Sequence, residues 1–478
     1  MRRVIRRVAD ETTVRPFVIA GILVAAYVLM VLPTLGQSLL ESHAFRQTQT
    51  AYTALLFAES GIDLLRPPLP VLGPPGIIPQ EFPVFQAVGS VLMSSGVPSD
   101  QAMRGTGLAA FVLSAILLFL LARRVLNDVA ALVALSAFLL NPHAWVYGRT
   151  SLIEYLATAG GLAFMLFATR WMDRGRLADW LLALAGGLLV ALVKITTAPI
   201  FLLPVLAWRM SSGRLAFRSV GVWSLIAAAS AVGLAWSQYA DSVRAANPAT
   251  AFLAAQNSVD WFFGSVLQRL DPSAWRVPLA VMLALTGSGL VVWGVAATQF
   301  AHRHPHQRGF LVGVLLSIVV PPVVLFNLYS AHDYYYAALA PPVALAIGMG
   351  AQRLLLRPRS RHRRLMLVGL IGAWLATIVG MTSTWSVIYG TPREEARLRE
   401  TVRFIREHSE PDDWIVIEGL GWNSAFLYYA HRRGFADPGS ENLLQPGELD
   451  TDAILSDPIY GPFFTCDSQG NCSVSDSR

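Results

Sequence analysis

The chain consists largely of apolar stretches that are separated by short polar segments. A membrane-spanning helix needs about 20 mostly apolar residues, and about eleven stretches of the 478 residues come near that length. They predict spans near 16–35, 105–122, 126–145, 153–169, 178–193, 197–209, 217–237, 277–297, 309–328, 336–354 and 365–388. The pattern therefore predicts a polytopic α-helical membrane protein.

Composition supports this prediction. Hydrophobic residues make up 54% of the chain and charged residues only 14%, against roughly 25% charged residues in an average soluble domain. So few charges could not cover a water-soluble protein of this size. The two cysteines are also too few for a disulfide scaffold.

Arginine indicates the orientation in the membrane. Cytoplasmic loops carry an excess of Lys and Arg, and every inner loop holds arginine if the N-terminus is cytoplasmic, for example Arg123, Arg170 and Arg357. An odd number of spans then places the C-terminal end outside. We expect a multi-pass protein of the inner or plasma membrane of the cell, with a cytoplasmic N-terminus and an extracytoplasmic C-terminal domain.

The long polar segments lie on the predicted outer side, at 36–104, 238–276 and 390–478. We therefore divide the chain into a membrane domain, 1–390, and a small outer α/β domain, 391–478. Within the latter, the pattern predicts helices over Arg393–His408 and Asn423–His431 and a strand over Trp414–Ile417. Cys466 and Cys472 predict a disulfide, since the outer side permits one; two free thiols are the alternative.

The first outer loop, 36–104, contains most of the candidate chemistry. A helix from about position 43 would place His43, Arg46, Gln47 and Thr50 on one face. We predict an amphipathic helix at the membrane surface, for which a merely solvated polar face is the alternative. A second surface helix would begin near Glu81, whose carboxylate suits a helix start and could have only that capping role.

Other polar residues gather at the predicted outer boundary. Arg149 and Glu154 flank the fourth span, where they could simply form a salt bridge or reach the interface. Lys194 is the only lysine in the chain, and its compact charge suits a phosphate or another anion. His332, Asp333 and Tyr335 open the tenth span; its tyrosines could be an interfacial aromatic belt.

Several function classes lack support in the sequence. There is no phosphate-binding lysine loop, dinucleotide fingerprint, HExxH or GxSxG motif. Ionisable residues within the predicted spans are nearly absent, whereas ion and proton pathways usually need them. A transporter is therefore disfavoured, and we expect no nucleic-acid partner.

Four strings, in this order along the chain, resemble the GT-C superfamily of membrane glycosyltransferases: ESHAFRQTQTA, QEFPVFQ, LLVALVKITTAP and HDYYYAALAPPVAL. The chain looks most like the bacterial branch similar to protein O-mannosyltransferases (family 39) and the aminoarabinose transferase of lipid A. Shared features are a single span, an outer loop with two surface helices, a multi-span bundle and an outer C-terminal domain. The resemblance covers about residues 10–390.

The resemblance implies an inverting transfer of a hexosyl or pentosyl group from a polyprenyl-phosphate sugar to a hydroxyl of a lipid, glycan or protein acceptor, next to membrane lipids in the cell envelope. A carboxylate or imidazole must take the acceptor proton, and cations must stabilise the leaving phosphate. The candidate bases are Glu41, with His43 and Glu81 as alternates. Lys194, Arg149 and Arg46 are the candidates for phosphate binding. Further substrate contacts are expected from Gln47, Glu154, His332, Asp333 and Tyr335.

The chain departs from the family at one point. Family members usually have an acidic pair in the first loop, and here Ser42 and His43 occupy those positions while Glu41 is displaced by one. No cofactor is certain; a divalent metal joining the donor phosphate to Glu81 and a histidine is an expectation without ligand spacing behind it. A lipid-linked glycan flippase or transporter, or a non-catalytic GT-C relative, is the alternative function.

Overall fold

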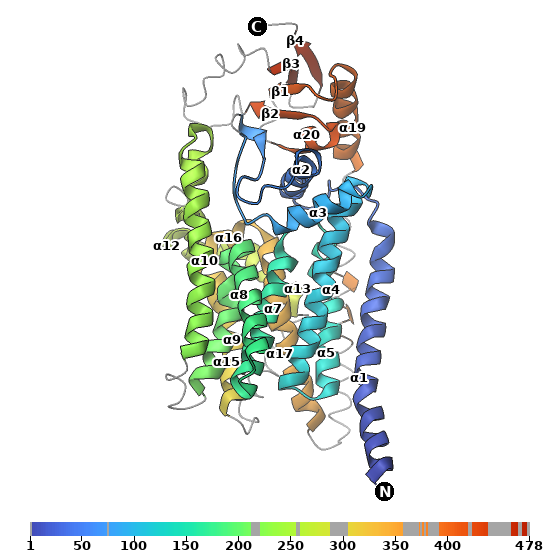
Figure 1. Cartoon of the computed structure of the whole chain (residues 1–478), viewed down its shortest axis with the longest axis vertical. Helices are drawn as coiled ribbons and strands as arrows, with labels where there is room; N and C mark the ends of the chain where they lie inside the picture. Colours follow the sequence, from blue (N-terminus) through green and yellow to red (C-terminus); the bar gives the residue numbers. More distant parts are fainter. Residues whose placement is uncertain are drawn as a thin grey trace.

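Long helices form a bundle with a small sheet at one end (Figure 1). The computed structural model describes residues 2–73, 76–211, 220–254, 259–286, 305–356, 392–418, 423–437, 460–466 and 471–475, with isolated helical positions between 372 and 380. Within these residues, five helices are long and apolar enough to cross a membrane: Val14–Thr34, Ser99–Val125, Leu177–Ser211, Val220–Ala245 and Gln307–Val324. The chain is therefore a membrane-embedded helical protein.

The remaining helices are shorter or less apolar. The N-terminal half contains α1 (Arg2–Val31), η1 (Leu32–Thr34), α2 (Ala44–Ser60), η2 (Pro70–Leu72), α3 (Val84–Ser94), α4 (Ser99–Val125), α5 (Asp128–Leu139), α6 (Pro142–Tyr147), α7 (Glu154–Arg174), α8 (Leu177–Lys194), η3 (Ile195–Thr197) and α9 (Ala198–Ser211). After it come α10 (Val220–Ala245), η5 (Pro248–Leu253), α11 (Val259–Phe263), α12 (Val266–Leu270), η7 (Pro272–Trp275), α13 (Arg276–Thr286), α15 (Pro305–Val324), α16 (Phe326–Ala331), η8 (Asp333–Leu339) and α17 (Ala340–Leu356).

The predicted spans 178–193 and 197–209 appear as α8 and α9, which are joined by η3. Arg124 contacts both Trp208 of α9 and Asp173 at the end of α7, so α9 runs back towards the end of the bundle where α8 begins. One predicted boundary differs from the structure. The predicted span 126–145 is instead divided into α5 and α6. Pro142 can start a helix but cannot continue one, and the Asn141 side chain caps the new start by accepting from the His143 N–H. The span 365–388 and the second half of 277–297 lie outside the described residues, apart from isolated helical positions.

The first outer loop differs from the surface helices that we predicted. Helix α2 lies across the end of the bundle (Figure 1) but has no solvated face, since every residue from Gln47 to Phe57 is buried. Helix α3 begins at Val84 rather than near Glu81, because the residue before Pro83 avoids the helical conformation. The loop is thus packed into the protein and can hold side chains in fixed positions.

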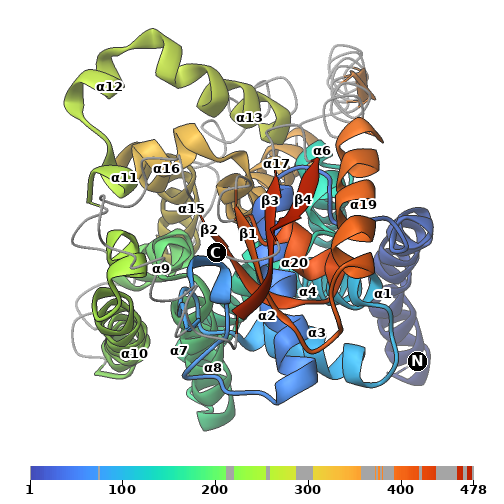
Figure 2. The same cartoon turned by 90° about the horizontal axis from the view of Figure 1, so that it is seen from above.

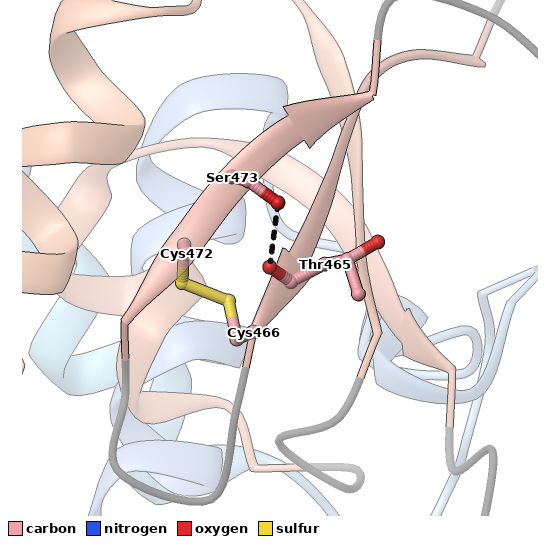
Figure 3. Close-up of a disulfide and its surroundings, with 4 residues drawn as sticks. All are labelled: Thr465, Cys466, Cys472 and Ser473. Atoms are coloured by element: carbon pink, nitrogen blue, oxygen red, sulfur yellow. Dashed lines mark hydrogen bonds between the residues drawn. A yellow bond between two sulfur atoms is a disulfide. The ribbon is translucent and has the colours of Figure 1, made fainter.

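The C-terminal part consists of α19 (Pro392–Glu407), β1 (Trp414–Glu418), α20 (Ala425–Ala430), β2 (Arg433–Asp437), β3 (Tyr460–Cys466) and β4 (Cys472–Ser475). The sheet order is β2-β1-β3-β4, in which β1 is parallel to both neighbours and β4 is antiparallel to β3. Cys466 and Cys472 form a disulfide across the β3–β4 pair, beside the Ser473 hydroxyl that donates to the Thr465 carbonyl (Figure 3).

This C-terminal part packs onto the first outer loop. Seen from above, the sheet and α20 lie over α2 (Figure 2). The Tyr52 hydroxyl on α2 donates to the Arg432 carbonyl at 3.0 Å, and the hydroxyls of Thr48 and Ser424 are 3.1 Å apart. Helix α2 is therefore held between the bundle and the C-terminal part.

Candidate functional site

A histidine and an aspartate from distant parts of the chain meet at the start of α2. Nε2 of His43 lies 2.6 Å from Oδ1 of Asp333. His43 caps α2 in the left-handed conformation, with φ of +56°, which is uncommon for a residue other than glycine. Residues held in such conformations cluster at functional sites, and the turn directs the imidazole towards η8.

Asp333 is fixed from three sides. The Tyr147 hydroxyl donates to the same Oδ1 at 2.7 Å, and Nε2 of His143 donates to the backbone carbonyl of Asp333 at 2.8 Å. Burial favours the neutral form of Asp333, but the hydrogen bonds from His43 and Tyr147 and the neighbouring histidine charges outweigh it and hold the pKa of Asp333 well below its usual range. Asp333 is therefore an ionised partner for the His43 ring.

His43 is the most accessible of the three candidate bases. Its side chain is 24% exposed, compared with 13% for Glu41 and 7% for Glu81. Nε2 is engaged by Asp333, and in the part of the chain that the structure describes no hydrogen bond to Nδ1 is found. The ring thus has one oriented nitrogen and one that can accept a proton.

Glu41 lies in a separate group of charges. One carboxylate oxygen accepts from Arg104 at 2.6 Å and the other from Arg149 at 2.9 Å. Arg104 is fully buried and also donates to the carbonyls of Gln37 and Ser38. These arginines hold both oxygens of Glu41, so the group fixes the segment that leads to His43.

Lys194 lies beside η8, not in the Arg149 group. Its ammonium pairs with Glu154, at the start of α7, and is 3.7 Å from the ring centroid of Tyr335. A cation over an aromatic face is stabilised by the ring quadrupole. Three of the predicted residues are therefore in contact.

Arg46 and Glu81 form the link between α2 and the segment before α3. Their side chains are 2.5 Å apart, and the Gln86 amide donates to the other oxygen of Glu81 at 2.7 Å. Burial raises the pKa of Glu81, but the charge and hydrogen bonds of Arg46 and the amide of Gln86 lower it more. Glu81 is a buried, paired carboxylate and not a free helix cap.

His332 connects these pairs electrostatically. Burial, together with the charges of His43, Lys194 and Arg46, lowers the pKa of His332 to about 4. Its ring stacks on Tyr334 with centroids 5.1 Å apart. We refer to His43, Arg46, Lys194, His332 and Asp333 as the outer cluster, because the charges of the other four residues all act on His332.

Sequence reasoning did not find several residues that support the site. The candidates did not include Arg104, Tyr147, His143 and Gln86. Of these, only Arg104 could have been found from the sequence, because it directly precedes the predicted span 105–122. Gln47, predicted to contact substrate, is fully buried and bonds the Ser42 carbonyl at 2.7 Å and the Ser151 N–H at 3.1 Å. Across the described ranges, no three His, Cys, Asp or Glu side chains lie close enough to hold a metal ion.

No family model matches this sequence, and no curated protein matches it. Solved structures do match. ArnT from Cupriavidus metallidurans bound to undecaprenyl phosphate is similar over 92% of this chain and 92% of its own, with 14% identity and a TM-score of 0.62. The Archaeoglobus fulgidus oligosaccharyltransferase in the apo form matches over 90% of this chain and 64% of its own, with 12% identity and a TM-score of 0.57.

A third similar structure is the arabinofuranosyltransferase AftD from Mycobacteria. It matches over 88% of this chain and 31% of its own, with 16% identity and a TM-score of 0.50. At these identities the likeness concerns the fold, and it extends over most of this chain in all three cases. The chain therefore has the GT-C fold, the fold of a superfamily of membrane glycosyltransferases.

Proposed function

We propose that the chain is an integral membrane glycosyltransferase that moves a sugar from a polyprenyl-phosphate donor to a hydroxyl acceptor, with inversion, at the extracytoplasmic face. The observation that carries the proposal is the His43–Asp333 pair, 2.6 Å apart, within a cluster that also contains Lys194 and Arg46. The GT-C fold and the undecaprenyl phosphate bound to the similar ArnT structure support the donor class.

The chemical step needs a base for the acceptor hydroxyl. The hydroxyl oxygen bonds to the anomeric carbon while the bond from that carbon to the phosphate oxygen breaks, and the electron pair leaves with the lipid phosphate. The hydroxyl proton goes to Nδ1 of His43. Asp333 keeps Nε2 protonated and stabilises the imidazolium that forms, as an oriented carboxylate does in other histidine bases. His43 therefore replaces Glu41 as our first choice of base.

Cations stabilise the leaving phosphate. Lys194 and Arg46 act on the same ring, His332, and each is neutralised by a carboxylate, Glu154 and Glu81 respectively. A donor phosphate would draw these cations to itself as its charge grows. Arg149 is already held by Glu41, so we assign the phosphate to Lys194 and Arg46, with Tyr335 and His332 beside them.

An apolar cavity offers room for the first isoprene unit of the prenyl chain. It has a volume of about 180 Å³ and is lined by α7, α8, η3, α9 and α10, including Val190, Ile195 and Leu234. Ile195 directly follows Lys194 in the sequence. A chain that lies in this cavity would begin next to the cation that we assign to the phosphate.

The side of the membrane follows from the distribution of arginine, and we propose a cytoplasmic N-terminus and an extracytoplasmic C-terminal domain. The outer loop with His43 and the C-terminal sheet lie at the same end of the bundle (Figure 1). Further sequence-based proposals are the eleven spans, the domain boundary near 390, the hexosyl or pentosyl group, and a lipid, glycan or protein acceptor. The divalent metal also stays a proposal, which transfer in the presence of EDTA would test.

The test is turnover by the purified protein in lipid nanodiscs with a panel of polyprenyl-phosphate sugars, followed by release of the lipid phosphate. We expect His43→Gln to lower the rate about 10²–10⁴-fold with unchanged affinity for the donor, and Asp333→Asn to lower it as well. Because the pKa of His332 is about 4 and that of Asp333 is well below its usual range, neither titrates between pH 5 and 8. Neither group should therefore add a step to the pH–rate profile of the wild type within this window.

The control is His408→Gln, which changes an exposed histidine directly after α19. This variant should retain the wild-type rate. Full activity of His43→Gln would overturn the assignment, and loss of activity only in Glu81→Gln or Glu41→Gln would move the base to that carboxylate. The rival function, a lipid-linked glycan flippase or transporter, predicts movement of the donor across a vesicle membrane without its consumption.

A further inference from the structure

A second cavity lies where the C-terminal part meets the end of the first span. It has a volume of about 620 Å³, within the range of ligand sites. Three of its lining side chains are arginines of α19, Arg399, Arg403 and Arg406. None of its lining residues belongs to the outer cluster, so it is a different place from the proposed reaction site.

The three arginines form one positively charged wall. They lie at positions i, i+4 and i+7 of α19, which places them on one face of the helix. The lining also contains the carboxylates of Glu407 and Asp100, and Asp100 accepts a hydrogen bond from Tyr428 at 2.7 Å. Arg406 also donates to the carbonyls of Ala430 and Tyr429, which holds its charge at the cavity. Three cations and two carboxylates line the cavity, so its net charge is positive and favours an anion.

The same cavity has an apolar side. Leu40 belongs to the segment that leaves the first span, and Leu398 and Val402 are buried residues of α19. Cations and apolar side chains in one cavity match an amphipathic ligand better than a small ion. Guanidinium groups in turn match phosphate oxygens, which they bind in pairs of hydrogen bonds.

The position of the cavity indicates where such a ligand comes from. Gly36 and Ser38, which line it, follow directly after the apolar span Val14–Thr34. Only 17% of that span's apolar window is buried within the protein, so most of it faces lipid. The cavity therefore lies at the depth of the phosphate groups of the bilayer.

We propose that this cavity binds the headgroup of an anionic phospholipid, with the phosphate on Arg399 and Arg403 and the glycerol region against Leu40 and Val402. A bound lipid would join α19 to the segment 36–40. That segment is held on its other side by Arg104, which donates to the carbonyls of Gln37 and Ser38. The lipid would thus strengthen the contact between the C-terminal part and the loop that leads to His43.

The experiment measures lipid binding to the purified full chain in a non-ionic detergent by native mass spectrometry. We expect short-chain phosphatidylglycerol to bind, and phosphatidylcholine to bind at least about tenfold more weakly because it carries no net negative charge. The double substitution Arg399→Gln, Arg403→Gln should weaken phosphatidylglycerol binding by about tenfold or more. Arg399→Lys, Arg403→Lys should stay within a few-fold of the wild type.

One control separates this site from a general effect of charge. Arg433→Gln changes a partly exposed arginine of the same part of the chain outside the cavity and should leave phosphatidylglycerol binding unchanged. Equal binding of both lipids, or unchanged binding by the glutamine double variant, would overturn the proposal. Inorganic phosphate that binds as tightly as phosphatidylglycerol would assign the cavity to a free anion instead. Binding is measured without turnover, so these outcomes do not depend on the proposed transferase activity.

Discussion

At the scale of single residues, the partners of each charge decide its role. Glu41 and His43 are two positions apart, yet Glu41 is held by two arginines and His43 by one aspartate. The first arrangement stabilises a charge that does not have to change, because both oxygens already accept hydrogen bonds. The second leaves a ring nitrogen for proton transfer. We therefore assign a structural role to Glu41 and the proposed proton transfer to His43.

This division predicts the effect of Glu41→Gln on stability. Removing one member of a buried ion pair costs about 3–5 kcal/mol, since the remaining charge is left without compensation, and the remaining charge here is the fully buried Arg104. We expect a clearly lower midpoint of thermal unfolding in detergent. Glu59→Gln is the matched control, because Glu59 pairs with Arg433 at 3.6 Å in an exposed position and should change stability by less than about 1 kcal/mol. An unchanged midpoint combined with lost transfer would return the role of base to Glu41.

The sequence predicted most residues of the site but not which of them contact each other. His43 and Arg46 were candidates because they share a predicted helix face, and Lys194 because it is the only lysine. His332 and Asp333 were candidates because they open a predicted span. Which of them pair could not be predicted, since Asp333 lies 290 positions after His43 and such contacts depend on how the helices pack. The left-handed turn at His43 was missed for a related reason, because it results from the fixed positions of the elements on either side.

At the scale of elements, small residues set how closely the helices of the bundle approach. In membranes, helix packing relies on such residues because lipid gives little hydrophobic driving force. Gly107 of α4 is one case, since a Cβ at this position would lie 2.2 Å from the carbonyl oxygen of Thr150, just before α7. A Cβ at Gly105, two residues earlier on the same helix, would meet no atom within 4 Å. The two glycines therefore have different roles.

The contrast gives a prediction with an internal control. Gly107→Ala should destabilise the protein by about 1–3 kcal/mol or more, because the backbone of Thr150 has to move. Gly105→Ala should be neutral or stabilising by about 0.5–1 kcal/mol, since alanine is the better helix former. Chemical unfolding in mixed micelles, followed by circular dichroism, measures both. Equal effects of the two substitutions would contradict the packing described for α4.

Elements with a strong local pattern were predicted well. Trp414–Ile417 is a strand and the charged segment before it is a helix, as expected. Strands β2, β3 and β4 were not predicted, because their pairing with β1 is decided by contacts between distant segments. The buried state of α2 was missed because its polar residues resemble a solvated face, whereas they form hydrogen bonds inside the protein.

At the scale of the whole molecule, the first outer loop and the C-terminal part lie at the same end of the helical bundle (Figure 1). The outer cluster, the arginine-lined cavity and the C-terminal sheet all lie there. The proposed orientation places this end outside the cell, and it rests on the arginines of the opposite loops. The two cysteines of the chain, Cys466 and Cys472, offer a direct test, since both belong to the C-terminal part.

We expect a membrane-impermeant maleimide to label intact cells only after treatment with an impermeant reductant. The disulfide protects both thiols before reduction, and an outer C-terminal domain makes them accessible afterwards. Labelling that also requires permeabilised cells would place the domain inside. Labelling without a reductant would show free thiols.

The contact between the C-terminal part and α2 has a consequence for local stability. Tyr52 and Thr48 of α2 are bonded to Arg432 and Ser424, and the backbone N–H of Leu39 donates to Tyr429 at 2.7 Å. Segments joined in this way open together in native-state fluctuations. The sheet and the helix that presents His43 would therefore form one cooperative unit, so the last fifth of the sequence determines how rigidly a residue near its beginning is held.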